Sequence, residues 1–320
     1  MARSAPATAR NPAMSPELPA ISTEVREAVG DGRPVVALET SIITHGLPRP
    51  RNAEIAEEAE ESLRRAGVVP ATTGVLDGVP KVGLTPGELH RLAGTDAAKA
   101  SVRDLPVLWA KSRSAGTTVA ATAWLAHRAG LEFFATGGLG GVHHGAAGGI
   151  EEPPSYDESA DLPLLATLPI TVVTAGVKSI LDRAATLERM ETLGITVVGF
   201  GTDRFPGFYV ADSGLALDHR LDTPAEVAAL LTARRKLGLR AATVLANPVP
   251  LPAQLDPELH ERVVAEAWQA ARERGISGPA TTPFLLEHIR AATGDRSLEA
   301  NLAAYFHNIA VAAECAHAAG

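Results

Sequence analysis

The feature that most restricts the fold of this chain is a repeated alternation of short apolar runs with longer amphipathic segments. The apolar runs lack the polar alternation of half-exposed strands, so we expect strands that are covered on both faces. They span residues 34–38, 71–76, 131–136, 170–175, 195–200 and 241–246. Predicted helices span residues 52–67, 117–129, 179–193, 224–237, 257–274 and 297–317. This order predicts an α/β fold, with a mostly parallel sheet flanked by helices.

Two local motifs and the first residues refine this prediction. Asn52 is expected to cap the helix over 52–67, and Gly67 to end it. Asp77 and Gly78, between two apolar runs, predict a small β-hairpin attached at one edge of the sheet. Residues 1–22 contain no continuous apolar block and are expected to be a disordered tail rather than a signal peptide or anchor. Residues 23–320 are expected to form a single α/β domain.

Composition excludes several classes of partner. The formal net charge of −8 and the absence of a long basic run argue against binding to a nucleic acid polymer. No apolar run has the length of about 18 residues that a membrane span needs. The single cysteine, Cys315, excludes an internal disulfide and suits a reducing compartment, so we expect the protein in the cytoplasm.

Chemically distinctive residues follow several of the predicted strands. Glu39 follows the first strand, and a polar, turn-rich stretch expected to lie outside the core comes after it. The segment TGGLGGVHHG (136–145) follows the third strand, and Asn247 follows the last. Since ligands of parallel sheets bind at the carboxyl edge, these residues are candidates for one site. Five glycines offer N–H groups to a phosphate, although such loops are often only tight turns.

Lys178 stands where the strand over 170–175 ends. Only five of the 29 basic residues are lysines, so most basic positions are arginine. A lysine retained at such a position is a candidate nucleophile, because an amine that loses its proton attacks a carbonyl and a guanidinium does not. The simpler alternative is a surface ion pair with Asp182, one helical turn further on.

Residues 136–161 also contain possible metal ligands. His143 and His144 are either ordinary loop residues or nitrogen donors. An acidic cluster could supply hard oxygen ligands to Mg²⁺ or Mn²⁺, or could be a solvated loop. The cluster consists of Glu151, Glu152, Asp157, Glu158 and Asp161.

Taken together, ordered motifs from Val35 to Glu314 resemble the pseudouridine-5′-phosphate glycosidases. The matching segments are VALETSIITHGLPRPRN, VPATTGVLDGVPKVGL, KASVRDLP, GTTVAAT, FATGGLGGVHHG, DESADL, TAGVKSILD, LANPVP, TPFLL and SLEANLAAYFHN. The resemblance implies an α/β enzyme, a homotrimer with one Mn²⁺ per subunit. It implies reversible cleavage of the C–C bond that joins uracil to ribose 5-phosphate, a reaction at the border of hydrolase and lyase chemistry.

The resemblance also implies roles for individual residues. Lys178 matches the nucleophile, which forms an imine (Schiff base) with C1′ of the ring-opened ribose, and Glu39 matches the proton donor. Lys99 matches a second active-site lysine that binds substrate and favours the free amine of Lys178. Asp157 matches the metal ligand. The remaining substrate-binding positions implied are Val119, Thr136, His143, Ser159, Asp161 and Asn301, and the amide of Asn301 suits a uracil edge.

Two departures from the family pattern leave other functions open. The loop over 146–156 is longer than expected by about half a dozen residues, within the usual range of loop insertions. His144 stands where an arginine is expected. One alternative is therefore a C-glycosyl synthase of secondary metabolism that joins ribose 5-phosphate to an aromatic acceptor. Another is a catalytically silent sugar-phosphate binding protein, which would need neither Glu39 nor Lys178.

Overall fold

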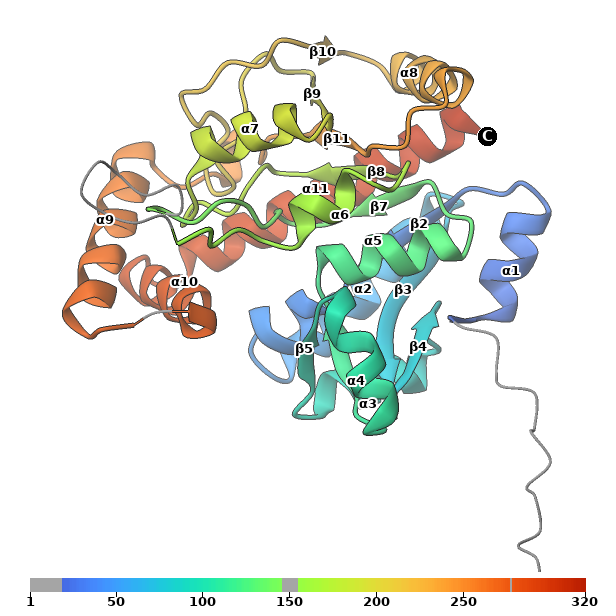
Figure 1. Cartoon of the computed structure of the whole chain (residues 1–320), viewed down its shortest axis with the longest axis horizontal. Coiled ribbons are helices and arrows are strands. Elements are labelled where there is room, and N and C mark those ends of the chain that lie inside the picture. Colours follow the sequence, from blue (N-terminus) through green and yellow to red (C-terminus); the bar gives the residue numbers. More distant parts are fainter. Residues whose placement is uncertain (1–18, 146–154, 277) are drawn as a thin grey trace, which may run out of the picture.

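A single, mostly parallel sheet organises the chain (Figure 1). The computed structural model describes residues 19–145, 155–276 and 278–320. The strands are β1 (Ala20–Ile21), β2 (Val35–Leu38), β3 (Val69–Leu76), β4 (Val79–Val82), β5 (Ala98–Ala100), β6 (Ala115–Thr117), β7 (Phe133–Ala135), β8 (Thr171–Thr174), β9 (Thr196–Phe200), β10 (Arg220–Leu221) and β11 (Thr243–Ala246). They lie in the order β1-β4-β3-β2-β7-β8-β11-β9-β10, and β6 pairs with both β3 and β5. Among these described strands, pairing is antiparallel where β3 meets β4 and β6 and parallel elsewhere.

Helices cover both faces of this sheet. The helices are α1 (Thr23–Gly30), α2 (Arg51–Arg65), α3 (Pro86–Gly94), α4 (Leu105–Ala110), α5 (Val119–Arg128), α6 (Asp161–Leu165), α7 (Arg183–Thr192), α8 (Pro224–Leu237), α9 (Pro257–Glu273), α10 (Thr281–Ala292) and α11 (Arg296–Ala319). Helices α2, α8 and α11 pack on one face, and α1, α5, α6 and α7 on the other. In Figure 1, α11 runs behind the sheet. No helix among the described residues is both long and apolar enough to cross a bilayer.

Short non-α turns complete the described secondary structure. They are the π-helix η1 (Ile42–Gly46) and the 3₁₀-helices η2 (Val102–Asp104), η3 (Leu251–Ala253) and η4 (Gly278–Ala280). Of these, η1 matters most for the site because it directly follows the segment that carries Glu39. Ile42, Ile43 and Leu47 are buried, so the prediction that this stretch lies outside the core is wrong.

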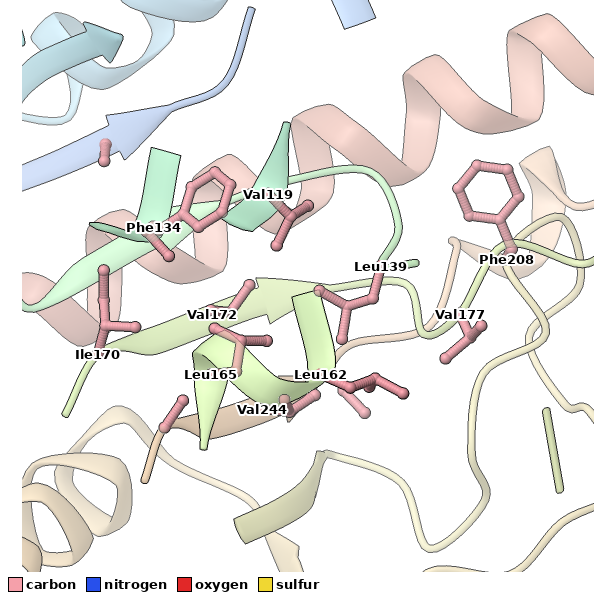
Figure 2. Packing of buried hydrophobic residues seen from close by; sticks show 14 of the residues in the cluster. Val119, Phe134, Leu139, Leu162, Leu165, Ile170, Val172, Val177, Phe208 and Val244 are labelled. Carbon is pink, nitrogen blue, oxygen red and sulfur yellow. The ribbon is translucent and has the colours of Figure 1, made fainter. Parts of the chain in front are cut away.

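The alternation of side chains along each strand divides the core in two. Val36 and Leu38 of β2 join the cluster under α2, α8 and α11, whereas Val35 and Ala37 join the cluster on the opposite face. Because both of its faces are buried, β2 is apolar at every position. Figure 2 shows the second cluster, in which Phe134 of β7 is fully buried.

The structure confirms the predicted α/β class and all of the predicted strands and helices, with shifted ends. It corrects two details. The tail of residues 1–22 was predicted too long, since Ala20 and Ile21 pair with β4 and Ser22 caps α1; residues 1–18 lie outside the described part. Asn52 is not a helix cap: α2 begins at Arg51, and the buried Asn52 side chain donates to the carbonyls of Ile43 and Ala93 at 2.9 and 3.0 Å.

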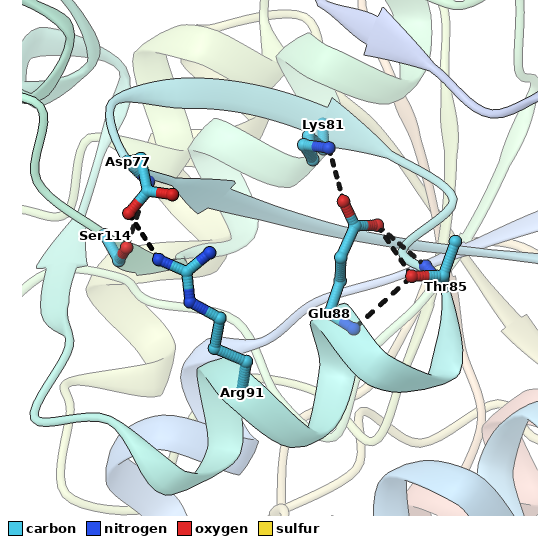
Figure 3. Close-up of polar contacts among 6 residues, drawn as sticks. All are labelled: Asp77, Lys81, Thr85, Glu88, Arg91 and Ser114. Atoms are coloured by element: carbon cyan, nitrogen blue, oxygen red, sulfur yellow. Dashed lines mark hydrogen bonds and ion pairs between the residues drawn. The ribbon is translucent and has the colours of Figure 1, made fainter.

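The predicted β-hairpin is confirmed at the β3–β4 turn. Asp77 and Gly78 both have positive φ, 50° and 86°, as the tight turn between two such strands requires. Figure 3 shows how α3 fastens the hairpin. Glu88 accepts a hydrogen bond from Lys81 and completes a capping box with Thr85, and Arg91 pairs with Asp77. This hairpin unit, residues 77–91, is therefore held by mutually paired charges.

Candidate functional site

The site begins at the point where the strand order of the sheet reverses. The chain continues from β2 to β3 on one side and later returns to place β7 on the other side of β2. A crevice opens at such a switch point beyond the carboxyl ends of the two strands. Glu39 directly follows β2 and Thr136 directly follows β7, and the Thr136 hydroxyl donates a hydrogen bond to Oε1 of Glu39. Ser41 donates to Oε2, so the 4% exposed Glu39 carboxylate is held at both oxygens.

Lys178 follows β8, the next strand in the sheet. The segments after β7 and β8 stay paired beyond the strands, because the Leu139 N–H donates to Gly176 O and the Lys178 N–H donates to Leu139 O, at 2.9 and 3.1 Å. Leu139 and Val177 point into the apolar cluster (Figure 2). These contacts fix the backbone of Lys178. The alternative of an ion pair with Asp182 is not borne out, since that carboxylate caps α7 by accepting from the Ala185 N–H at 3.0 Å.

Lys99 reaches the same region from β5. Burial and the charge of Lys178 lower the pKa of Lys99, although Glu39 and Asp161 act in the opposite direction. The side chain is nevertheless exposed, because the cavity that it faces is open to solvent. A lowered pKa makes the uncharged amine of Lys99 easier to form, which favours a free amine at this site.

A cavity of about 380 Å³ brings these groups together. Glu39, Lys99, Lys178 and Asn301 all line it, although they are far apart in the sequence. The volume lies within the usual range for small-molecule sites. Asn301 Oδ1 is buried and finds no hydrogen-bond partner among the described residues, so a ligand donor would satisfy it. Gly137 makes room for this amide, since a Cβ there would lie 2.8 Å from Oδ1.

Apart from Asn301, the wall opposite the strand ends was not predicted from the sequence. It consists of residues from η1, the Phe208–Tyr209 segment, α10 and the start of α11. On α10, Arg290 lines the cavity while two carboxylates, Glu287 and Asp295, bind its guanidinium. The sequence signals for this wall are His45 in the THG segment after Glu39, the TPFLL segment (282–286) and Asn301, and none of them indicates the place of Arg290 in the fold.

The glycine loop has two functions, and only one was predicted. Gly137 and Gly138 line the cavity, as expected of a ligand-binding loop. The other requirement is close packing: a Cβ at Gly138 would lie 2.4 Å from the Phe208 ring, and one at Gly140 2.3 Å from Ser159 Oγ. The N–H of Gly140 is already bound by Asp161 at 2.8 Å, so it is not available to a phosphate.

Several predicted substrate-binding residues lie beside the cavity rather than on its lining. Asp161 is 5% exposed and accepts from the N–H groups of Ala120 and Gly140, so it joins α5 to the glycine loop. Ser159 packs against that loop, and its hydroxyl accepts from the Asp161 N–H. The Val119 side chain is buried in the core, which leaves only its backbone for a ligand contact.

The predicted metal region is sparse in donors. The carboxylate of Asp157 is half exposed and lies 3.9 Å from His143 Nδ1. No group of three or more His, Cys, Asp or Glu side chains that could hold a metal occurs among the described residues. Among the described residues, Asp157 offers one carboxylate to a hard cation that keeps most of its water ligands. Glu151 and Glu152 lie outside the described residues.

His144 and Asn247, both singled out in the sequence, make structural contacts. His144 lies 3.9 Å from Asp182 and packs edge-on against Trp268, and burial lowers its pKa. The Asn247 amide donates to Asn308 at 2.9 Å, and Asn308 in turn donates to the Thr136 carbonyl at 2.7 Å. Asn247 thus ties α11 to the strand ends, and it does not line the cavity with Lys178.

Comparison with known proteins gives full-length matches. A family model described as "Indigoidine synthase A like protein" matches residues 24–318. A pseudouridine-5′-phosphate glycosidase from Saccharopolyspora erythraea is 63% identical over 302 residues, 94% of this chain and 98% of that protein. A protein of the same name from Frankia alni is 55% identical over 297 residues, 92% of this chain and 81% of that protein.

Two solved structures share the fold. The prealnumycin C-glycosynthase AlnA, in complex with ribulose 5-phosphate, has a TM-score of 0.85 and 33% identity, and the match covers 93% of this chain and 96% of that one. An indigoidine synthase A-like protein from Thermotoga maritima has a TM-score of 0.82 and 34% identity, covering 93% and 94%. The fold and most of its length are therefore common to all of these proteins.

Proposed function

This chain belongs to the indigoidine synthase A-like family and within it to the pseudouridine-5′-phosphate glycosidases, and from this premise we propose that it cleaves pseudouridine 5′-phosphate. The products are uracil and ribose 5-phosphate, and the reaction is reversible. One observation carries the mechanism: two lysines and a buried, doubly hydrogen-bonded carboxylate line one cavity at the switch point of the sheet.

Lys178 is the proposed nucleophile. Its Nζ forms a bond to C1′ as the bond from C1′ to the ring oxygen breaks, and Glu39 gives that oxygen a proton. The nitrogen then loses a proton, and its lone pair forms a C=N bond as the C1′–C5 bond breaks and C5 of uracil takes up a proton in the same step. Water adds to the iminium and releases ribose 5-phosphate and the free amine. This route avoids direct departure of a uracil carbanion, which explains the need for an amine.

Other groups position the substrate in this scheme. Lys99 supplies charge beside Lys178 and binds the substrate, and Asn301 pairs with the uracil edge through its amide. Thr136 and Ser41 orient the Glu39 carboxyl. Asp157 would hold Mn²⁺, which supplies positive charge to a phosphorylated substrate when bound. We also propose substrate contacts from Val119, His143, Ser159 and Asp161, a homotrimer, and a cytoplasmic location that suits the lone buried Cys315.

A uracil-release assay tests the function. Purified protein is given pseudouridine 5′-phosphate or unphosphorylated pseudouridine, with and without Mn²⁺. Uracil from the phosphate ester, and little from the nucleoside, is the expected result. Absence of release from folded protein with metal supplied would contradict the proposal.

Chemical trapping tests the nucleophile separately. Ribose 5-phosphate is added with borohydride, which reduces an imine to a stable amine, and the modified peptide is identified by mass spectrometry. We expect the label on Lys178. A label on Lys99, whose pKa is lowered, would exchange the roles of the two lysines.

A C-glycosyl synthase is the second candidate, because AlnA carries that name and shares the fold. The higher identity to the glycosidases, 63% against 33%, favours cleavage. Coupling of ribose 5-phosphate to an aromatic acceptor, without coupling to uracil, would reverse this preference.

A further inference from the structure

The π-helix η1 holds Thr44 in a fixed position next to Glu39's strand. Both the N–H and the Oγ1 of Thr44 lie 2.9 Å from the carbonyl oxygen of Thr40. The neighbouring strand β6 presses on this threonine: a Cβ at Gly116 would lie 2.1 Å from Thr44 Oγ1. The glycine therefore permits a contact that fixes where the hydroxyl lies. Single π-helical turns of this kind occur frequently at functional sites.

This geometry determines which nitrogen of His45 carries the proton. Two oxygens 2.9 Å apart need a proton between them, and the only one available is on Thr44 Oγ1. The same Oγ1 lies 2.7 Å from His45 Nδ1. Since the Thr44 hydroxyl donates its proton to the Thr40 carbonyl, it accepts a hydrogen bond from His45, and Nδ1 must be the donor. In the neutral ring, Nε2 then carries a lone pair and is an acceptor.

The surroundings favour the neutral ring. His45 lines the cavity with the proposed catalytic groups. Partial burial of the ring and the charge of Lys99 lower the pKa of His45, and Asp96 opposes them; the residue as a whole is exposed to the open cavity. Nδ1 forms a hydrogen bond with Thr44, so Nε2 is the ring nitrogen that remains free to bind a ligand in the cavity. No partner for Nε2 occurs among the described residues.

We infer that His45 is a specificity-determining residue of this site, whose Nε2 accepts a hydrogen bond from a hydroxyl group of the sugar phosphate. A fully ionised phosphate has no proton to donate, so an acceptor nitrogen selects hydroxyls and not the phosphate. A ring-opened ribose carries hydroxyls along its chain. The inference rests on the proposed function for its substrate class, and it adds a residue to which the preceding scheme gives no role.

The protonation state is tested first, by ¹⁵N NMR of histidine-labelled protein. The shifts of the two ring nitrogens distinguish the cation and the two neutral forms. We expect His45 to be neutral, with the proton on Nδ1, and Thr44→Val to remove this preference. A proton on Nε2, or a cationic ring, in the wild-type protein at neutral pH would overturn the inference whatever reaction the enzyme catalyses.

The hydroxyl contact is tested by a matched series of variants and ligands. His45→Asn removes the acceptor at the Nε2 position, whereas His45→Gln places an amide oxygen near it. Each is measured for binding of ribose 5-phosphate and of analogues that lack one hydroxyl. His45→Asn should weaken ribose 5-phosphate about tenfold, as expected for a lost hydrogen bond, and His45→Gln less. His90→Asn, on the exposed surface of α3, is the control.

Combining a protein variant with a ligand analogue tests whether His45 and one sugar hydroxyl form the same hydrogen bond. For one analogue, the loss from His45→Asn and the loss from the missing hydroxyl should not add, because both remove the same contact. Additive losses with every analogue would overturn the inference. If the wild-type enzyme releases uracil normally in that case, the proposed function stands and only the role of His45 fails. If wild-type protein neither releases uracil nor binds ribose 5-phosphate, both fail.

Discussion

The hairpin unit and the cavity use the same residue types in opposite ways. In the hairpin unit, Lys81 is bound by Glu88, and that carboxylate also caps α3 (Figure 3). Burial would raise the pKa of Glu88, but hydrogen bonds from Lys81 and Thr85 outweigh it and lower the pKa. In the cavity, Lys99 and Lys178 share one space, and neither forms an ion pair within the part of the chain that the structure describes. The paired charges of the hairpin unit stabilise one edge of the sheet, whereas the unpaired lysines of the cavity remain available to react with a substrate.

The largest expected effect distinguishes the two kinds of lysine. Lys178→Ala should lower turnover by at least about 1000-fold, because the covalent route is lost. Lys81→Ala removes only a partly exposed ion pair and should change turnover by less than about twofold. Initial rates of uracil release measure both, and thermal unfolding checks that each variant is folded. Similar rates for the two variants would show that the lysines of the cavity and of the hairpin unit do not differ in their role in catalysis.

The two carboxylates provide the next contrast. Glu39→Gln keeps the shape and the contacts with Thr136 and Ser41, whose hydroxyls can rotate, but it has no acidic proton. Turnover should fall by about 100- to 10,000-fold, as expected for loss of a general acid. Glu88→Gln should leave turnover unchanged. The ratio of kcat values measures the effect, and an active Glu39→Gln enzyme would require another proton donor.

The free energy of unfolding should distinguish Asp161, beside the cavity, from Asp77, in the hairpin unit. Asp161→Asn leaves one of two buried backbone N–H groups, on Ala120 or Gly140, facing the amide nitrogen, which cannot accept a hydrogen bond. We expect a loss of about 1–3 kcal/mol in the free energy of unfolding. Asp77→Asn breaks an exposed ion pair with Arg91 and should cost less than about 1 kcal/mol. Urea denaturation measures both, and equal losses would contradict the proposed bracing of the glycine loop.

The smallest effect concerns pH. Because the pKa of Lys99 is lowered in the folded protein, the unfolded chain binds more protons between that value and the ordinary 10.5. Stability contributed by Lys99 therefore rises with pH across this window. The unfolding free energy of the wild type, compared with that of Lys99→Met, should increase as the pH is raised. The exposed Lys111→Met is the control, and a difference that falls with pH would mean that Lys99 is stabilised as a cation.

The sequence predicted the parts of the molecule that depend on local pattern. Buried parallel strands are continuously apolar, so the sheet, its carboxyl edge and the residues that follow each strand could be found. Glu39 and Lys178 were found in this way, and Lys99 and Asn301 through the resemblance. The missed wall of the cavity depends on tertiary packing instead. Nothing near Phe208 or Arg290 signals that these residues meet the strand ends.

Short elements escaped prediction for a related reason. Strands β5 and β6 have three residues each, AKA and AGT, so no run of large apolar side chains marks them as it marks β7. Asn52 has the residue type and position of a helix cap, yet it is buried and joins η1 to α3. Its amide satisfies two carbonyls that no local pattern places nearby. The η1 turn, and with it the protonation state of His45, likewise could not be predicted from a local sequence pattern.

The late position of α11 in the chain has a consequence for biosynthesis. Asn301 lies on this helix, and Asn308 of the same helix binds the Thr136 carbonyl through its amide. A nascent chain that has left the ribosome only as far as residue 295 already contains Glu39, Lys99 and Lys178. It lacks the helix that completes the cavity around them. A reactive amine is thus assembled into a working site only after α11 has been synthesised, so nascent chains that lack this helix are expected to be inert toward sugar phosphates.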